Sequence, residues 1–404
     1  MSKSRLKWGL WLAGTAAVAA TLYGCGGGGT GTGFVPVSNV RVFGDSLADS
    51  GTFGIKFTVN LAGDSSLAAK GQPTVIWPEK VASFAGKPVC NFFASSNSGV
   101  SFTTTASCGS FAVGGGRINN QASNGGPSAP TAIPFQMSTA FGVGTYSSSE
   151  LVLIDGGGND AADLLSKYLA AGAGGSGPAD YLAFLGSNSN AVMSSTDVAA
   201  TFSSPPASLV TAGTKYMTGL ANKFADDITN SVLNKGAKRV IVFNVPDITL
   251  SPRFQAVLAQ VSAANGGGST GAAVSAAVQS SARSWIQTFN STLSSRFSGN
   301  TSIAIIDAYT DFNAQIASPT TYGYASASST PNPLTTPVCP QTGTDGSGLP
   351  SYNFATCTAA ALDTAANPAN WRQYIFADGF HPTPYGHQLF GEKVILTAVG
   401  RGWL

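Results

Sequence analysis

Residues 40–46 read Val-Arg-Val-Phe-Gly-Asp-Ser, a short apolar run that ends at a glycine and two polar residues. Similar apolar runs occupy residues 151–154, 239–243 and 302–306. Runs of this length that are apolar almost throughout are typical of strands buried on both faces, as in a parallel sheet. We expect one further strand just before Gly114. Together these runs predict a mostly parallel, five-stranded sheet.

Helical patterns fill the intervals between these strands. Residues 217–232 and 274–297 place an apolar side chain at every third or fourth position, which marks the buried face of a helix. Thr383-Pro384 is typical of an N-cap followed by a first helical residue, and we expect a final helix from there to about Val399. The alternation of strands and helices predicts a three-layer α/β/α sandwich.

The predicted domain covers residues 39–404. Its Ser-, Gly- and Asn-rich stretches near residues 170–210, 255–272 and 325–370 are expected to be loop insertions. Sheets of this kind bind ligands at the carboxyl ends of their strands. We therefore expect the chemistry after the first strand, beside the glycines near residue 114, and after the run at 151–154.

Charge and ligand chemistry exclude several classes of function. The 404 residues carry 21 Lys and Arg against 19 Asp and Glu, so the net charge of +2 gives no basis for nucleic-acid binding through phosphates. With 2 His and no CxxC pattern, the sequence predicts no metal site. A formal GxGxxG match at residues 26–31 lacks the strand and the helix of a dinucleotide site, and we expect no cofactor.

The amino-terminal residues are typical of an export signal. An apolar run over residues 8–22 follows a basic start made of Lys3, Arg5 and Lys7. It is too short to span a bilayer comfortably. Residues 22–25 (Leu-Tyr-Gly-Cys) resemble the lipobox of bacterial lipoproteins, in which the cysteine takes a diacylglyceryl group and becomes the mature N-terminus.

This resemblance implies a signal peptide over residues 1–24, a lipid on Cys25 and a Gly-rich tether over residues 25–38. The exported protein would then be anchored in the outer membrane through acyl chains. The alternative is ordinary cleavage near residues 17–19, which leaves an extracellular protein with an odd thiol at Cys25.

Four cysteines remain for an oxidising compartment, where an even number favours disulfides. Three connectivities are possible. Proximity in the sequence favours Cys90 with Cys108 and Cys339 with Cys357. Each bond would close a loop of about 19 residues and contribute on the order of 3 kcal/mol.

Two segments place polar or glycine residues directly after predicted strands. Ser46 follows the first strand, where we expect a helix to begin, with its Oγ exposed and backbone N–H groups directed toward an oxyanion. The alternative is that Ser46 only caps that helix. The glycines at residues 114–116 can present a backbone N–H to a ligand without a side chain in the way.

Two further segments add an amide and an imidazole. Asn159 lies in residues 155–160, after another strand, where its side chain can donate to an oxyanion or simply occupy a turn. Asp378 precedes His381 by three residues, so its carboxylate can hold the imidazole in one tautomer, as a general base requires. His387 falls inside the final helix and is expected to be a structural or surface residue.

These four segments resemble the conserved blocks of the GDSL family, the SGNH hydrolases, in its lipase and esterase branch. Residues 44–47 spell the motif that names the family. Residues 112–115 resemble the second block, residues 158–160 the third, and Asp378-x-x-His381-Pro382 the fifth. All four occur in the family order, and the resemblance covers residues 39–404. It implies a flavodoxin-like, five-stranded sheet.

The resemblance also implies a role for each site residue. Ser46 would be the nucleophile, His381 the general base and then the acid, and Asp378 the residue that orients the imidazole. The oxyanion hole would use the N–H groups of Ser46 and Gly115 and the side chain of Asn159. Gly114 is the other choice for the second donor, and the spacing to the strand favours Gly115.

The implied activity is hydrolysis of a carboxylic ester, of a lipid or a small acyl compound, through an acyl-enzyme. A carbohydrate acetylesterase would use the same residues on acetylated glycans. A surface binding protein that keeps the fold without turnover is the alternative from another class of function.

Overall fold

A computed structural model of the protein describes residues 35–60, 76–187, 192–364 and 370–404. The predicted signal peptide, most of the predicted tether and Cys25 lie outside the described residues. Residues 36–404 form one compact unit.

Four parallel strands form the central sheet, in the spatial order β1-β4-β5-β6. They are β1 (Val40–Phe43), β4 (Leu151–Ile154), β5 (Arg239–Phe243) and β6 (Ile303–Ile306). Each strand occupies one of the apolar runs that predicted it. The register pairs Phe43 with Ile154, so the carboxyl ends of β1 and β4 lie side by side.

The segment expected to be a fifth strand lies against the free edge of β1. The N–H of Phe111 donates to Val42 and the N–H of Val42 donates to Gly109, at 2.8 and 2.9 Å. Only Ser110 pairs with β1 as an isolated parallel bridge, so the regular sheet has four strands instead of the five predicted. With this segment included, the order of chain segments across the sheet matches the flavodoxin-like prediction.

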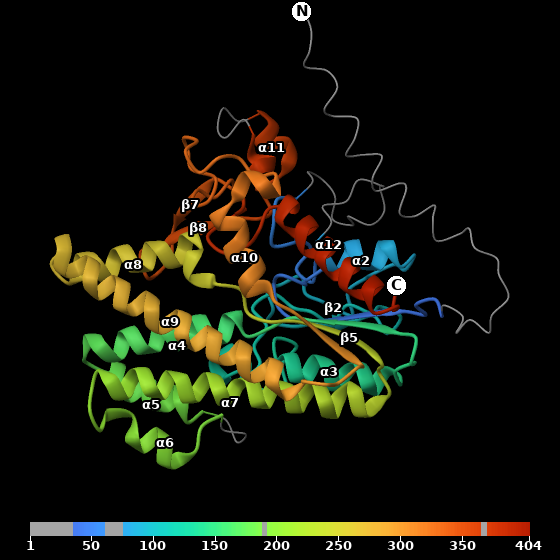
Figure 1. Ribbon diagram of the computed structural model, residues 1–404, viewed down its shortest axis with the longest axis horizontal. Coiled ribbons are helices and arrows are strands. Elements are labelled where there is room, and N and C mark those ends of the chain that lie inside the picture. Colours follow the sequence, from blue (N-terminus) through green and yellow to red (C-terminus); the bar gives the residue numbers. More distant parts are fainter. Residues whose placement is uncertain (1–34, 61–75, 188–191, 365–369) are drawn as a thin grey trace, which may run out of the picture. The chain divides into compact units, whose positions relative to one another are not determined.

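Helices cover both faces of the sheet (Figure 1). Because side chains alternate along a strand, Leu151 and Leu153 join one core while Val152 and Ile154 join another. The first core includes side chains of α2 (Trp77–Phe84) and α12 (Pro384–Gly400). The second is built on α3 (Ile133–Val143), α4 (Gly158–Ala173), α7 (Ala207–Ser231) and α9 (Gly268–Arg296). The three predicted layers are confirmed.

Two of the three predicted loop regions are largely helical. The region near 170–210 contains α5 (Gly177–Leu185) and α6 (Ser195–Ala199). The region 255–272 lies in α8 (Pro252–Ala264) and the first turns of α9, so the prediction of a loop there is wrong. Alanine and glutamine supply helix propensity in α8, and Ser251 caps it ahead of a proline at its first position.

The third region, near 325–370, is mostly irregular. It holds the short hairpin of β7 (Gln341–Thr344) and β8 (Pro350–Tyr352), and α11 (Ala359–Thr364). α10 (Ala308–Ala317) precedes it, after β6. A second small hairpin, of β2 (Phe93–Ala94) and β3 (Thr103–Thr104), lies between α2 and α3.

The two disulfides are those that sequence proximity favoured. Cys90 bonds to Cys108 and Cys339 to Cys357, with Cα atoms 4.9 and 5.2 Å apart. The N–H of Cys339 donates to the carbonyl of Ala377 at 2.8 Å. This hydrogen bond joins the irregular region to the segment that leads into Asp378, and the second disulfide closes a loop within that region.

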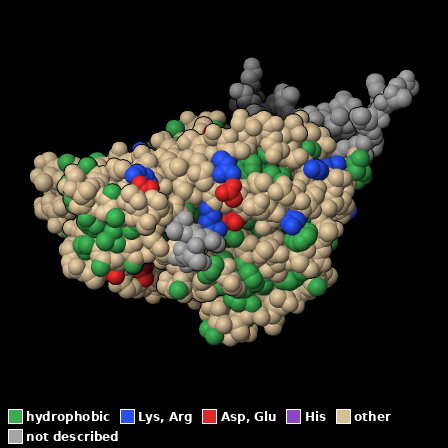
Figure 2. Space-filling model, turned by 90° about the horizontal axis from the view of Figure 1, so that it is seen from below, with side chains coloured by type: hydrophobic (Ala, Val, Ile, Leu, Met, Phe, Trp, Pro, Cys, Tyr) green, Lys and Arg blue, Asp and Glu red, His purple; other side chains and the backbone are tan. Residues whose placement is uncertain are grey.

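The surface reflects the low content of charged residues. On the face shown in Figure 2, Lys, Arg, Asp and Glu side chains are few and are surrounded by uncharged surface. In the described part of the chain, no helix combines the length and the apolar character needed to cross a membrane.

Candidate active site

Ser46 lies in a single turn that follows β1. The carboxylate of Asp45 accepts the N–H of Leu47 at 3.0 Å, and the N–H of Ala48 donates to the carbonyl of Asp45 at 3.1 Å. Among the described residues no helix begins there, so the expected helix N-terminus at Ser46 is wrong. Aspartate side chains explain this, because they take up backbone N–H groups that a helix would use.

The turn can form only because residue 44 is a glycine. The φ angle of Gly44 is +154°, and a Cβ at this position would lie 1.4 Å from Oδ1 of Asp155. The side-chain amide of Gln136, from α3, accepts the N–H of Gly44 at 2.9 Å and donates to its carbonyl at 3.0 Å. Oδ1 of Asp155 accepts the N–H of Asp45 at 3.0 Å. Buried side chains from two other segments thus hold the peptides on both sides of Gly44.

A tight loop before α12 brings Asp378 to His381. The N–H of Ala377 donates to the carbonyl of His381 at 2.7 Å and closes the loop. One carboxylate oxygen of Asp378 accepts the N–H groups of Phe380 and His381 at 2.8 and 2.6 Å. Both carboxylate oxygens lie 3.0 Å from Nδ1 of the His381 ring.

The other ring nitrogen of His381 meets Ser46. Nε2 lies 2.7 Å from Oγ of Ser46, although the two residues are 335 positions apart in the sequence. The rings of Phe57 and Phe354 pack against the imidazole, with centroids 5.2 and 5.4 Å away. One continuous set of hydrogen bonds therefore runs from the hydroxyl to the imidazole and on to the carboxylate.

Asp378 and His381 each shift the pKa of the other. Burial opposes ionisation of Asp378, but the charge of His381 and three hydrogen bonds outweigh it, so the pKa of Asp378 is lowered. Burial also lowers the pKa of His381, but the charge and hydrogen bond of Asp378 dominate and leave that pKa above its ordinary value. The imidazole is therefore a stronger base than a free histidine side chain.

The glycine segment holds two candidate backbone donors, the N–H groups of Gly114 and Gly115. The N–H of Gly114 is already bonded to Oδ2 of Asp49 at 2.7 Å. Among the described residues, no hydrogen bond occupies the N–H of Gly115 or of Ser46. Gly115 also lines the cavity described below, whereas Gly114 does not. These contacts favour Gly115 over Gly114 as a donor.

Asn159 lies in the first turn of α4. Its Nδ2 donates to the carbonyl of Gly116 at 3.0 Å, and a weaker contact of 3.4 Å reaches Asp45. The structure thus brings together all five predicted residues of the triad and the oxyanion hole. They come from four segments that are far apart in the sequence.

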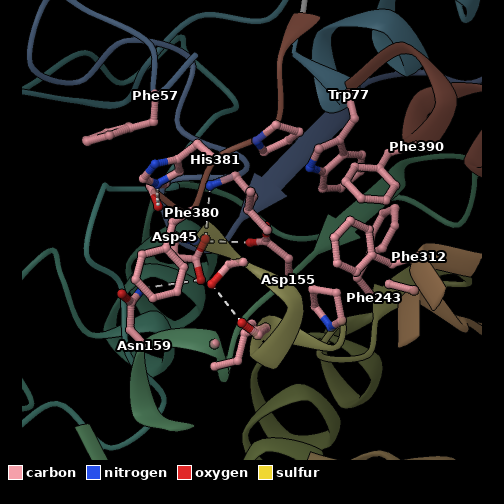
Figure 3. A pocket seen from close by; sticks show the side chains of 18 of the residues that line it. Asp45, Phe57, Trp77, Asp155, Asn159, Phe243, Phe312, Phe380, His381 and Phe390 are labelled. Carbon is pink, nitrogen blue, oxygen red and sulfur yellow. Dashed lines mark hydrogen bonds between the residues drawn. The ribbon is translucent and has the colours of Figure 1, made fainter. Parts of the chain in front are cut away.

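An apolar cavity of about 310 Å³ adjoins these residues. In Figure 3, Asp45, Asn159 and His381 lie on one side, and Trp77, Phe243, Phe312 and Phe390 gather on the other. The ring of Phe243 contacts those of Trp77 and Phe390, with centroids 4.6 and 5.9 Å away. Ala308 and Ile375 complete much of the apolar wall.

Several residues of the site escaped the sequence analysis. Asp155 directly follows a strand, and this position at the carboxyl end of the sheet could have marked it as a candidate site residue. Gln136 gave no such signal, because nothing in its helix marks it as buried and polar. Burial raises the pKa of Asp155 well above the usual value, and the neighbouring charge of Asp45 raises it further. Both effects disfavour the ionised form of Asp155.

The chain has one other histidine. His387 is buried in α12, and burial lowers its pKa to about 3, so it stays neutral. Within the described ranges, no group of three or more His, Cys, Asp or Glu side chains is arranged to hold a metal ion.

Comparison with known proteins places the chain in a family. Among solved structures, an extracellular lipase from Streptomyces rimosus is similar over 89% of this chain and 98% of that chain, with 14% identity and a TM-score of 0.36. No curated protein matches. The family model described as GDSL-like Lipase/Acylhydrolase matches residues 40–394, which is most of the chain. The protein therefore belongs to the GDSL-like lipase/acylhydrolase family and is an enzyme that hydrolyses ester bonds.

Proposed function

We propose that the protein is an exported serine esterase that cleaves carboxylic esters with an apolar acyl chain. One observation carries the proposal: the hydrogen bonds run from Ser46 through His381 to Asp378, and Ser46 and His381 line an apolar cavity. Hydroxyl, imidazole and carboxylate in this order are the parts of a nucleophilic serine site.

In the proposed reaction, Oγ of Ser46 attacks the ester carbonyl while Nε2 of His381 takes the hydroxyl proton. Asp378 stabilises the imidazolium that forms and keeps its ring in place. The imidazolium then gives the proton to the departing alcohol, which leaves an acyl-enzyme. Water, activated by the same imidazole, attacks this ester, and the carboxylic acid is released.

Three donors would stabilise the oxyanion of each tetrahedral intermediate. They are the N–H groups of Ser46 and Gly115 and the side-chain amide of Asn159. One N–H of Asn159 is held by the carbonyl of Gly116, and the other makes only the long contact to Asp45, so a ligand can take it. Removing one such donor typically costs about 10²–10³ in kcat.

The cavity favours a longer acyl chain over an acetyl group. Each methylene buried there contributes about 0.8 kcal/mol, or about fourfold in kcat/KM. An acetyl group offers a single methyl to a cavity of about 310 Å³ and leaves most of the aromatic wall without a partner. An acetylated glycan therefore exploits this site less well than a longer acyl ester does.

Export is the second part of the proposal. The two disulfides support an oxidising compartment. The proposed signal peptide and the lipid on Cys25 rest on the sequence alone. The mass of the mature N-terminal peptide from the membrane fraction distinguishes a diacylglyceryl cysteine from cleavage near residues 17–19.

The test of the proposed nucleophile is Ser46→Ala. We expect the purified wild-type chain to hydrolyse nitrophenyl esters and to be labelled by a fluorophosphonate, and the variant to lose both properties while it keeps its melting temperature. Without the hydroxyl no acyl-enzyme can form. Turnover or labelling that persists in the variant would contradict the assignment, and a wild-type chain without either property would favour a binding protein.

The pH dependence of kcat/KM should show an acid limb set by His381. Only the neutral imidazole accepts the Ser46 proton, so activity falls as the pH drops through the raised pKa of His381. Asp378→Asn removes the charge that raises this pKa, so the limb should move to lower pH and the plateau should fall by about 10³–10⁴. An acid limb that keeps its position in this variant is the result that rejects the pairing.

The acyl preference can be tested by filling the cavity. We expect kcat/KM to rise with chain length in a series of nitrophenyl esters from acetate upward, until the cavity is full. Ala308→Leu adds bulk to the wall and should shorten the preferred chain by about three carbons, with little effect on the acetate. Ala317→Leu, at the exposed end of the same helix, is the control. An unchanged optimum in Ala308→Leu, or acetyl-xylan as the best substrate, would show that the acyl chain binds elsewhere.

A further inference from the structure

The N–H of Gly115 belongs to a turn whose type decides where that N–H points. The N–H of Gly116 donates to the carbonyl of Val113 at 3.0 Å, which closes a turn over residues 113–116. Gly115 has a φ of +77°, while Gly114 lies outside the positive-φ region, as in a type II turn. In the competing type I turn the peptide between the two glycines is rotated by about half a turn. Gly115 would then present its N–H in a different direction.

Charged side chains form hydrogen bonds to the peptides on both sides of the one between Gly114 and Gly115. Asp49 is buried and accepts the N–H of Gly114 at 2.7 Å. Its other oxygen accepts the N–H groups of Gly51 and Thr52 at 2.9 and 2.7 Å, so the carboxylate itself is fixed. On the far side, Nη1 of Arg117 donates to the carbonyl of Gly115 at 2.6 Å.

Arg117 is itself clamped. Its Nε and Nη2 donate to the two carboxylate oxygens of Asp163 at 2.6 and 3.1 Å, the paired geometry that a guanidinium fork forms with a carboxylate. Asp163 lies on α4, four residues after Asn159, so both side chains stand on one face of that helix. The arginine therefore links the Gly115 turn to the helix that carries the other proposed donor.

We propose that Arg117 is a positioning residue that keeps the turn over residues 113–116 in its type II form. Asp163 holds the Arg117 side chain in place. The type II turn directs the N–H of Gly115 toward the oxyanion that forms when Ser46 attacks the ester. The proposal rests on the proposed role of Ser46 and extends it. Arg117 touches neither the nucleophile nor the acyl cavity. It acts through the carbonyl of Gly115.

The first test is Arg117→Gln, assayed with a nitrophenyl ester. The donor acts on the transition state, so kcat should fall by about 10- to 100-fold while KM stays within about threefold. An alkyl trifluoromethyl ketone, which adds to the serine and forms an oxyanion there, should lose affinity by the same factor as kcat/KM. Arg117→Lys keeps the charge but not the fork, and should lose rate as well.

A matched control exists elsewhere in the fold. Arg296 of α9 also bridges an aspartate, Asp226, and a backbone carbonyl, that of Asn222, but it lies outside the cavity. Arg296→Gln should leave kcat, KM and inhibitor affinity unchanged. The end point of fluorophosphonate labelling counts the folded sites in each preparation, so a loss of folded protein is not taken for a loss of rate.

Three results would overturn the positioning role: a kcat in Arg117→Gln within about threefold of wild type, a loss confined to KM, or unchanged ketone affinity despite a slower kcat. Full activity in Arg117→Lys would equally reject the need for the fork. If Arg117→Gln does not fold, Asp163→Asn serves instead, because it weakens the hold on the Arg117 guanidinium. This variant should lose kcat and ketone affinity in the same way, by smaller factors. If it loses neither, the proposal is rejected. Activity that survives Ser46→Ala refutes the proposed function itself, whereas an inactive Ser46→Ala beside a normal Arg117→Gln refutes only the positioning role.

Discussion

The contact between the backbone of Gly44 and the carboxyl group of Asp155 is the constraint on which the site depends. Parallel pairing of β1 with β4 brings the ends of both strands to the same level. There is no space for a side chain at residue 44, and the turn that follows must leave the sheet at once. This sharp exit carries Ser46 above the sheet edge. Asn159, in the first turn of α4, approaches the same place because its helix begins just after β4.

Buried carboxyl groups organise the backbone around this contact. Asp45, Asp49, Asp155 and Asp160 are all buried, and each accepts at least one backbone N–H. Burial raises the pKa of each, to about 6 for Asp49 and Asp160. Burying an acid without a cationic partner costs free energy that a well-packed apolar core would not. In exchange, the hydrogen bonds of these carboxyl groups fix the orientation of several backbone peptides, as a preorganised oxyanion site requires.

The irregular region near 325–370 takes part in the site although it contributes no reacting group. Phe354 packs edge-on against the His381 ring. The disulfide between Cys339 and Cys357 closes a loop within this region, and the N–H of Cys339 donates to the carbonyl of Ala377, next to Asp378. Phe57, from the loop after the turn that holds Ser46, packs on the same imidazole. Aromatic rings on two sides leave His381 few orientations besides the one that faces Ser46.

Local chemistry in the sequence was enough for the four strands of the sheet and the two disulfides, and it singled out Ser46, Asn159, Asp378 and His381 as candidates. Apolar runs, short cysteine spacing and an Asp three residues before a His all report on neighbours along the chain. The predictions of a helix at Ser46 and of a loop at 255–272 were wrong because other local effects outweighed the sequence patterns behind them. Aspartate side chains bind backbone N–H groups at the first site, and alanine favours a helix at the second.

Only the tertiary structure decided which peptides and side chains meet across long separations. Spacing along the chain already favoured Gly115 over Gly114 as the candidate donor, but only the fold shows that Asp49, 65 residues from Gly114, accepts the N–H of Gly114. The hydrogen bonds of Gln136 to Gly44, the burial of Asp155 and the ion pair between Arg117 and Asp163 arise in the same way. No periodicity marks such contacts, because they depend on how folded segments pack in space and not on the spacing of residues along the chain.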